Sequence, residues 1–298
     1  MSEILDAVRP LASVTQQHPL SLRLIRHAIR ELPSARRRAA FDAYVAMPPS
    51  YFEDMERELA HVLMASGQSF DACLRDLDAF NALTPEVDND TWYDQPRAFT
   101  SMHLDALLLG FSRRRLMVTC DQLRRAVREP ARLLEVGAGS GRLAGMLADA
   151  LPDWRFTLVD RSAAAVRFAG WLHAARGTSD RVWCLKGDLS HLPAPDASVD
   201  VVVAAEVLEH APNPVHSVQE MLRVLRPGGW LAVSVPVDLD IAMHPTVFHS
   251  TNEVLAFFSQ FPLEPIDFTL VMPDLLDAIV DVVPGFPGCV NAVFRRTG

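Results

Sequence analysis

The chain has 298 residues, 49% of them hydrophobic, which is enough to bury a sizeable core in one large domain or in a main domain with an accessory one. Its formal net charge of −9 argues against a nucleic acid backbone as the main partner, because proteins that bind one need a basic surface. No apolar run approaches membrane-spanning length, and the first residues lack the basic and apolar regions of a signal peptide. We therefore expect a globular protein of the cytoplasm, with no nucleic acid and no membrane as partner.

Residues 1–128 read as helical throughout, and prolines divide them into short helices. Apolar residues recur there at intervals of three and four, at Leu22, Ile25, Ile29 and Leu32 and again at Leu104, Leu107, Leu108 and Phe111. The second group predicts a last helix that runs on to Pro130. We predict that residues 1–128 form a helical lid and substrate-binding region.

Residues 88–101 interrupt this helical rhythm with acidic and aromatic residues. A loop that carries Trp92, Tyr93 and Phe99 can cover a substrate pocket in the region that follows. Alternatively, it can be a linker whose aromatic rings pack one domain on the other. The sequence leaves both interpretations open.

From Arg132 the pattern changes to strands alternating with helices, which predicts an α/β sheet with crossover connections over residues 129–298. The unbroken valine run at 199–205 is typical of a central parallel strand that is buried on both faces. Ser162 and Asn213 are expected to cap helices. Strands are predicted at 133–136, 155–160, 182–188, 199–205, 230–235, 266–271 and 290–295, and a late helix at 251–261.

The stretch from Leu133 to Gly141 reads Leu-Leu-Glu-Val-Gly-Ala-Gly-Ser-Gly, a buried strand that runs into a glycine turn, and a helix follows at once. The glycines remove side chains where the backbone must bend sharply and lie against a ligand. A dinucleotide-binding fingerprint needs a further glycine at 142, where this chain has Arg142. The pattern acid-x-Gly-x-Gly-x-Gly instead resembles the first motif of class I S-adenosylmethionine-dependent methyltransferases.

Four further features follow in the order of that family: acids at the ends of the second and third strands (Asp160, Asp188), the exit Glu-Val-Leu-Glu-His at 206–210, and the turn Arg-Pro-Gly-Gly at 226–229. Together they resemble its small-molecule branch, which includes ubiquinone and menaquinone biosynthetic methyltransferases. The resemblance covers about residues 130–298 and implies a Rossmann-like, doubly wound sheet of seven strands whose last strand is antiparallel. It implies S-adenosylmethionine across the carboxyl ends of the first strands. The family's core has no counterpart of the N-terminal region, so the acceptor stays open.

The resemblance also implies roles for single residues. Asp160 is expected to accept both ribose hydroxyls. Asp188 is expected to bind the exocyclic amine of adenine, and the neighbouring amide the ring. Glu135 supports either the glycine turn or the cofactor's ammonium group, or it has a purely structural capping role. The expected cofactor-binding set is Glu135, Gly137, Ala138, Gly139, Gly141, Asp160, Arg161, Asp188, Leu189 and Glu206.

If the exit at 206–210 is helical, Glu206, Glu209 and His210 share one face near the reacting methyl group. In some resembling families this motif holds a divalent cation, and His244 or His249 would then supply a further ligand. In others it shapes the pocket or forms a structural ion pair. His210 or His249 as a general base is a third interpretation. We predict His210, Glu209, Tyr93 and His249 as catalytic residues and expect no tightly held metal.

The leading functional prediction is methyl transfer to an oxygen, nitrogen or carbon nucleophile of a small molecule, in secondary or specialised metabolism. A second hypothesis keeps the cofactor but has a nucleophile attack the aminopropyl carbon, as in a cyclisation, and releases methylthioadenosine. A third is a catalytically silent scaffold, which the intact glycines and strand-end acids disfavour. The sequence does not decide the oligomeric state, and a homodimer stays an open alternative.

Overall fold

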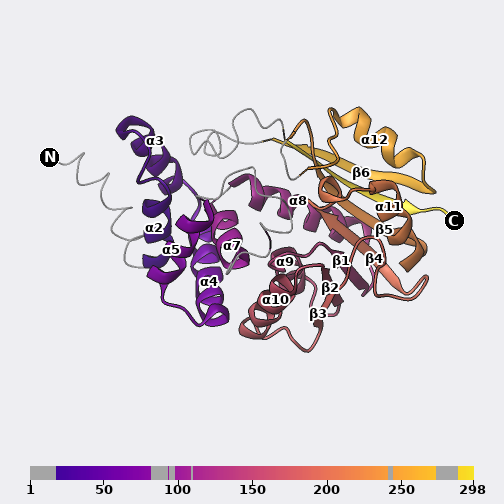
Figure 1. The fold of residues 1–298 in the computed structure, drawn as a ribbon, viewed down its shortest axis with the longest axis horizontal. Coiled ribbons are helices and arrows are strands. Elements are labelled where there is room, and N and C mark those ends of the chain that lie inside the picture. The colour runs from indigo at the N-terminus through magenta and orange to yellow at the C-terminus, as the bar shows by residue number, and fades with distance from the viewer. Residues whose placement is uncertain (1–17, 82–92, 94–97, 109, 241–243, 273–287) are drawn as a thin grey trace.

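The computed structural model describes residues 18–81, 93, 98–108, 110–240, 244–272 and 288–298 (Figure 1). The helices are α2 (Pro19–Ala28), α3 (Ser34–Val45), α4 (Pro49–Ser66), α5 (Phe70–Asn81), α7 (Ala98–Leu108), α8 (Gly110–Ala126), α9 (Arg142–Ala150), α10 (Ala163–Ala175), η1 (Leu208–His210, a short 3-10 helix), α11 (Pro214–Val224) and α12 (Thr251–Ser259). The strands are β1 (Arg132–Val136), β2 (Arg155–Asp160), β3 (Val182–Lys186), β4 (Val199–Ala205), β5 (Leu225–Pro236), β6 (Leu263–Val271) and β7 (Cys289–Arg296).

The seven strands form one sheet in the order β3-β2-β1-β4-β5-β7-β6. The first five pair in parallel, whereas β7 runs antiparallel to both of its neighbours, β5 and β6. This confirms the predicted seven-stranded sheet with an antiparallel last strand. The order reverses direction at β1, so the carboxyl ends of β1 and β4 flank a switch point, where open α/β sheets bind their ligands.

Both faces of the sheet are covered. Alternate residues of β4 point to opposite faces: Val201 and Val203 pack with α8 and α9, while Val202 and Ala204 pack with α11 and α12. All four of these side chains are buried, as the valine run predicted. The helices begin where the sequence provides caps. Ser162 Oγ accepts from the N–H groups of Ala164 and Ala165 at the start of α10, and Asn213 caps α11 in the same way.

The N-terminal helices α2 to α7 gather beside the sheet, and α8 connects them to it (Figure 1). Their buried residues form one apolar cluster, which includes Phe52, Leu59 and Leu104 and also takes in Phe168 and Leu172 of α10. The N-terminal helices therefore pack directly on α10, the helix that connects β2 to β3. The division into domains at residue 128 stays a prediction.

Helix α8 packs against the sheet through a stripe of apolar and polar residues. Its Leu116, Cys120 and Leu123 join the core under β1 and β4. Beside them, Asn291 of β7 donates through Nδ2 to Thr119 Oγ1 at 2.7 Å. This polar contact is buried, so it fixes how α8 sits on the sheet.

The structure differs from the sequence prediction in several boundaries. Residues 98–101 belong to helix α7 rather than to a loop, and the last N-terminal helix is two helices, α7 and α8. Strand β3 ends at Lys186, before Asp188, and β5 begins at Leu225, so the Pro-Gly-Gly turn lies inside it. Leu225 pairs with Val199 and Trp230 with Val201, so the extra residues make an irregularity in the ladder. Most of the predicted loop at 88–101, including Trp92, falls outside the described residues.

No helix in the described part of the chain is long and apolar enough to cross a membrane. All four cysteines are free, and three of them are buried. The cytoplasmic location expected from the sequence stays a prediction.

Candidate functional site

A cavity of about 490 Å³ opens at the carboxyl ends of the parallel strands. It is lined by the glycine turn after β1, by the ends of β2 and β4, by the loop after β3, and by side chains from α7 and α8. Nine of the ten residues expected to bind the cofactor line it: Glu135, Gly137, Ala138, Gly139, Asp160, Arg161, Asp188, Leu189 and Glu206. The cavity therefore collects residues that are far apart in the sequence into one site.

Gly141, the tenth residue, lies behind the turn. An added Cβ there would sit 3.0 Å from His173 Nε2 and 3.1 Å from Leu158 Cδ2. Its φ of +73° is also left-handed. Gly141 therefore lets α9 start close to α10 and β2, and its expected contact with the cofactor is not seen in the lining of the cavity.

Gly137 and Gly139 both have left-handed φ values, +66° and +53°, but their surroundings differ. A Cβ on Gly137 would lie 2.2 Å from Val207 Cγ2, which is a severe clash with the exit of β4. A Cβ on Gly139 would meet Phe99 Cε1 at 3.9 Å, across the cavity. Gly137 is therefore required by packing, whereas Gly139 keeps the cavity open.

Asp160 at the end of β2 is bound to the glycine turn. Its Oδ2 accepts from the backbone N–H of Gly139 at 2.9 Å, and its Oδ1 accepts from Ser162 N–H at 2.8 Å. Burial raises the pKa of this carboxyl, while the two N–H groups act in the opposite sense. Each oxygen retains a lone pair, and the side chain lines the cavity, so it can accept hydroxyl groups of a ligand.

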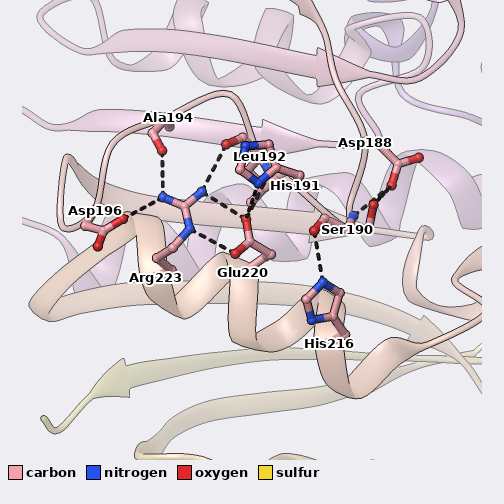
Figure 2. Close-up of polar contacts among 9 residues, drawn as sticks. All are labelled: Asp188, Ser190, His191, Leu192, Ala194, Asp196, His216, Glu220 and Arg223. Atoms are coloured by element: carbon pink, nitrogen blue, oxygen red, sulfur yellow. Dashed lines mark hydrogen bonds and ion pairs between the residues drawn. The ribbon is translucent and has the colours of Figure 1, made fainter.

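Asp188 lies in the loop after β3. Its Oδ1 accepts both the N–H and the hydroxyl of Ser190, at 2.8 and 2.6 Å. These hydrogen bonds lower its pKa and keep it ionised, and Figure 2 shows its second oxygen directed away from Ser190. His216 of α11 contacts the carbonyl oxygen of Ser190 at 2.9 Å. The carboxylate is therefore held in place with one oxygen available to an amine.

An arginine on α11 fixes the rest of this loop. Arg223 donates to the carbonyl oxygens of Leu192 and Ala194, at 3.0 and 2.9 Å, and to Asp196 at 2.7 Å (Figure 2). Glu220 pairs with Arg223 at 2.9 Å and accepts from Leu192 N–H at 3.1 Å. Arg223 makes a bidentate pair with Glu220, and both side chains hold the loop through hydrogen bonds to its backbone.

Glu135, in β1, is fully buried. Its Oε2 accepts from the N–H of Ala144, one of the N–H groups in the first turn of α9 that have no partner within the helix. Burial raises its pKa to about 8, so the side chain is largely protonated at neutral pH. Of the roles left open by the sequence, the structure provides direct contacts for the helix cap.

The exit of β4 differs from the expectation. It forms only the three-residue helix η1, so Glu206, Glu209 and His210 do not share a face of an α-helix. Glu206 itself has a left-handed φ of 54°, a conformation that costs a non-glycine residue about 1–3 kcal/mol. Backbone strain of this kind is often retained at functional sites.

Glu206 forms an ion pair with Arg115 of α8 at the edge of the cavity. The Glu206 carboxylate also accepts from Ser234 Oγ at 2.7 Å and from Cys289 Sγ at 3.2 Å. Burial alone would lower the pKa of Arg115, but Glu206 raises it above its ordinary value. The cavity therefore presents a carboxylate and a guanidinium side by side.

Glu209 and His210 have a different neighbour from the one expected. Glu209, His210 and His244 each offer a ligand atom within 4.8 Å of the others, and the rings of the two histidines meet edge to face at 4.8 Å. His244 Nδ1 contacts the carbonyl oxygen of Leu239 at 3.0 Å, so Nδ1 carries the proton and Nε2 is an acceptor. Glu209 is buried behind the cavity, and burial raises its pKa well above the ordinary value.

Tyr93 and Phe99 form an aromatic wall on the side of the cavity near His210. Their rings stack with centroids 6.0 Å apart, and Tyr93 Oη lies 3.4 Å from His210 Nε2. Burial, and then the nearby Glu209, raise the pKa of Tyr93, so its hydroxyl stays protonated and can donate to His210. These three side chains line the cavity together.

His249 does not join the site. Its side chain is 66% exposed and lies 3.3 Å from Asp238, outside the lining of the cavity. The prediction of His249 as a base or a metal ligand is therefore corrected. His244, five residues earlier in the sequence, lies beside His210 instead.

Sequence reasoning missed Arg115. Its signal was a polar stripe on α8: Arg115, Thr119 and Gln122 have helical spacing and lie next to Leu116, Cys120 and Leu123. A polar stripe beside an apolar one on a helix that packs inward indicates buried polar partners. Thr119 and Gln122 each make such a contact with Asn291, and Arg115 with Glu206.

A comparison with protein families finds a methyltransferase domain at residues 134–233. The chain is 35% identical over 105 residues to malonyl-(acyl-carrier protein) O-methyltransferase of Methylococcus capsulatus, which is 35% of this chain and 37% of that protein. It is 41% identical over 102 residues to 27-O-demethylrifamycin SV methyltransferase of Amycolatopsis mediterranei, which is 34% of this chain and 37% of that protein. The match thus spans little more than a third of these relatives.

Among solved structures, an S-adenosylmethionine-dependent methyltransferase from Aquifex aeolicus superposes with a TM-score of 0.50 at 19% identity. The superposition covers 62% of this chain and 93% of that one. At this identity the similarity concerns the fold, and it agrees with the sheet described above.

Proposed function

Because the chain belongs, through its methyltransferase domain, to the class I S-adenosylmethionine-dependent methyltransferase family, we propose that it transfers a methyl group from S-adenosylmethionine to a small molecule. The observation that carries this proposal is the hydrogen bond from Gly139 to Asp160 at the edge of the cavity. It joins the open glycine of the turn to the acid best suited to ribose hydroxyls. One relative's name, a rifamycin methyltransferase, supports an acceptor from specialised metabolism.

The order of the strands suggests how the cofactor lies. Asp188 follows β3, Asp160 ends β2, and Glu206 follows β4, with β1 and its glycine turn between them. We assign the adenine amine to Asp188 and the ribose to Asp160. The methionine end then reaches Glu206 and Arg115, where its ammonium and carboxylate groups meet charges of the opposite sign.

When bound, S-adenosylmethionine supplies an electrophilic methyl group, so the protein mainly has to align the acceptor and exclude water. Tyr93 and Phe99 provide an apolar wall for the acceptor. Two imidazoles line the described part of the cavity: His216 contacts the Asp188 loop, and His210 lies at the aromatic wall. His210 is therefore our candidate for the base that takes the acceptor's proton.

We propose that this transfer needs no resident metal. Glu206, one of the ligands considered from the sequence, is neutralised by Arg115. In the remaining group of Glu209, His210 and His244, burial raises the pKa of Glu209, which disfavours the ionised carboxylate that a cation binds. His210 beside a neutral Tyr93 and a buried Glu209 suits proton transfer better than binding of a cation.

Calorimetric titration with two nucleosides tests the proposed function. S-adenosylhomocysteine carries the amino acid end of the cofactor, and methylthioadenosine lacks it. We expect micromolar binding of S-adenosylhomocysteine, one per chain, and binding of methylthioadenosine weaker by at least about tenfold, the factor for 1.4 kcal/mol. No binding of S-adenosylhomocysteine would refute the proposal, and equal binding of the two would refute the assignment of Glu206 and Arg115.

A further inference from the structure

Two buried histidines that do not themselves line the cavity contact the glycine turn, whose Ser140 does line it. His103 of α7 is fully buried, and its Nδ1 lies 3.0 Å from Ser140 Oγ. His173 of α10 reaches the carbonyl oxygen of Gly141 through Nε2 at 3.2 Å. One of these contacts comes from within the sheet domain and the other from the N-terminal helices.

On its other side, His103 connects to α4. Its Nε2 lies 3.4 Å from Oε2 of Glu58, which is longer than an ordinary hydrogen bond but close enough for strong electrostatic contact. Glu58 pairs with Arg176 at the end of α10, and Arg176 contacts Asp149 at 2.6 Å. A line of polar contacts thus runs from α4 through α7 to the turn.

The groups around His103 determine which of its ring nitrogens carries the proton. Burial by itself would raise the pKa of Glu58, but His103 and Arg176 lower it far below its ordinary value, so the carboxylate only accepts. Burial also lowers the pKa of His103, which keeps the ring neutral. The Glu58 carboxylate beside Nε2 favours the neutral tautomer with its proton on Nε2. Nδ1 is then an acceptor, so the hydroxyl of Ser140 is the donor.

Ser140 needs such an anchor because glycines flank it on both sides. Gly139 and Gly141 have left-handed φ values, and residues without a Cβ have wide backbone freedom. Asp160 holds the turn at Gly139 N–H, and His173 holds it at the carbonyl of Gly141. His103 holds the only side chain between them.

We propose that His103 is a positioning residue for cofactor binding, which holds the glycine turn in its binding conformation through Ser140. The inference rests on the proposed function, and it extends the cofactor site to a helix outside the matched domain. The N-terminal helices then act on cofactor affinity as well as on the acceptor. The competing explanation is that His103 only satisfies the buried Glu58.

Two substitutions separate these explanations. In His103→Asn the side-chain oxygen takes the place of Nδ1, so it keeps the contact with Ser140 and loses Glu58. In His103→Gln the amide takes the place of Nε2, so it keeps Glu58 and loses Ser140. Titration with S-adenosylhomocysteine should find near wild-type affinity for His103→Asn and an affinity about tenfold weaker for His103→Gln, the factor for loss of one hydrogen bond.

A double-mutant cycle completes the test. His103→Gln should cause no further loss of affinity in a Ser140→Ala background, because the contact is already absent there. Wild-type affinity in His103→Gln, or equal losses in His103→Asn and His103→Gln, would overturn the inference. If His103→Gln does not fold, Ser140→Ala alone decides, since unchanged affinity in that variant also overturns it. Failure of the wild-type protein to bind S-adenosylhomocysteine would instead refute the proposed function.

Discussion

The backbone N–H of Gly139 donates a 2.9 Å hydrogen bond to Oδ2 of Asp160, which joins the glycine turn after β1 to the acid at the end of β2. The other oxygen of Asp160 binds the start of α10 through Ser162. One carboxylate therefore fixes the turn, begins a helix and lines the cavity. Its loss should affect the binding of a ligand more than the chemistry that follows.

Replacement of Asp160 by alanine should weaken S-adenosylhomocysteine binding by roughly 1.5–3 kcal/mol, the range for hydrogen bonds to a charged group. Because Asp160 is remote from the reacting methyl group in our assignment, the change should raise the Michaelis constant for S-adenosylmethionine. Calorimetry and steady-state kinetics measure the two effects. Normal affinity together with a large loss of turnover would show that Asp160 is misassigned.

Alanine at Gly137 and at Gly139 should have opposite consequences. Gly137→Ala brings a Cβ to 2.2 Å from Val207, so it should lower the melting temperature strongly. Gly139→Ala has space for the Cβ, so only the left-handed φ should lower its stability, by about 1–2 kcal/mol. The same variant should nevertheless lose affinity for the cofactor. Thermal unfolding and calorimetry on both variants test this. Unchanged affinity in a folded Gly139→Ala would count against the cofactor site.

Glu135 should make stability depend on pH. Its pKa is raised to about 8 by burial, above the ordinary value of 4.5, so the folded state holds a proton that the unfolded state releases. The free energy of unfolding therefore falls as pH rises from about 4.5 through 8. In Glu135→Gln this loss is absent. The free energy of unfolding of the variant, measured by urea denaturation, should therefore rise relative to that of the wild type between about pH 5 and 8.

The exposed Glu129 offers the matched control for this experiment. The free energies of unfolding of Glu129→Gln and the wild type should differ by a constant amount across the same pH range. If instead the wild type becomes more stable than Glu135→Gln as the pH rises, Glu135 is ionised in the folded state.

His210→Ala should lower turnover by about 10²–10⁴-fold, the usual contribution of a general base, with little change in cofactor affinity. His249→Ala is the control, since His249 is exposed and outside the cavity, and its turnover should match the wild type. Kinetics and calorimetry on both proteins measure this. Wild-type turnover in His210→Ala would leave His210 with a structural role only.

Dialysis against a chelator should leave activity intact, because the proposed transfer relies on His210 without a cation. Elemental analysis of the purified chain provides the independent measurement. One ion per chain, with turnover lost on dialysis and restored by Mg²⁺ or Mn²⁺, would reverse this conclusion. The ligands would then be Glu209, His210 and His244.

The sheet was predictable because its signals are local. A buried strand, a glycine turn and a helix follow one another at 133–150, and the acids Asp160 and Asp188 come directly at or after strand ends. Boundaries were less certain where two elements meet without a break. Strand β5, for example, begins before Gly228 because Leu225, directly after α11, already pairs with Val199 of β4.

The acceptor side was less predictable because its contacts are between distant elements. Arg115 meets Glu206 only after α8 packs on the sheet, and His244 meets His210 only after the chain returns from β5. Residue spacing can indicate that Arg115 has a buried partner, but it does not identify that partner. The same holds for His103 and Ser140, which belong to different regions of the sequence.

The central claim is that this chain catalyses methyl transfer, and the by-product tests it most directly. The purified protein is incubated with S-adenosylmethionine and a deproteinised extract of small molecules, so that no other enzyme is present. Chromatography then identifies the nucleoside that accumulates, with His210→Ala as the matched control. We expect S-adenosylhomocysteine to accumulate with the wild-type protein and far more slowly with the variant. Accumulation of methylthioadenosine instead, or no consumption of S-adenosylmethionine, would contradict the account.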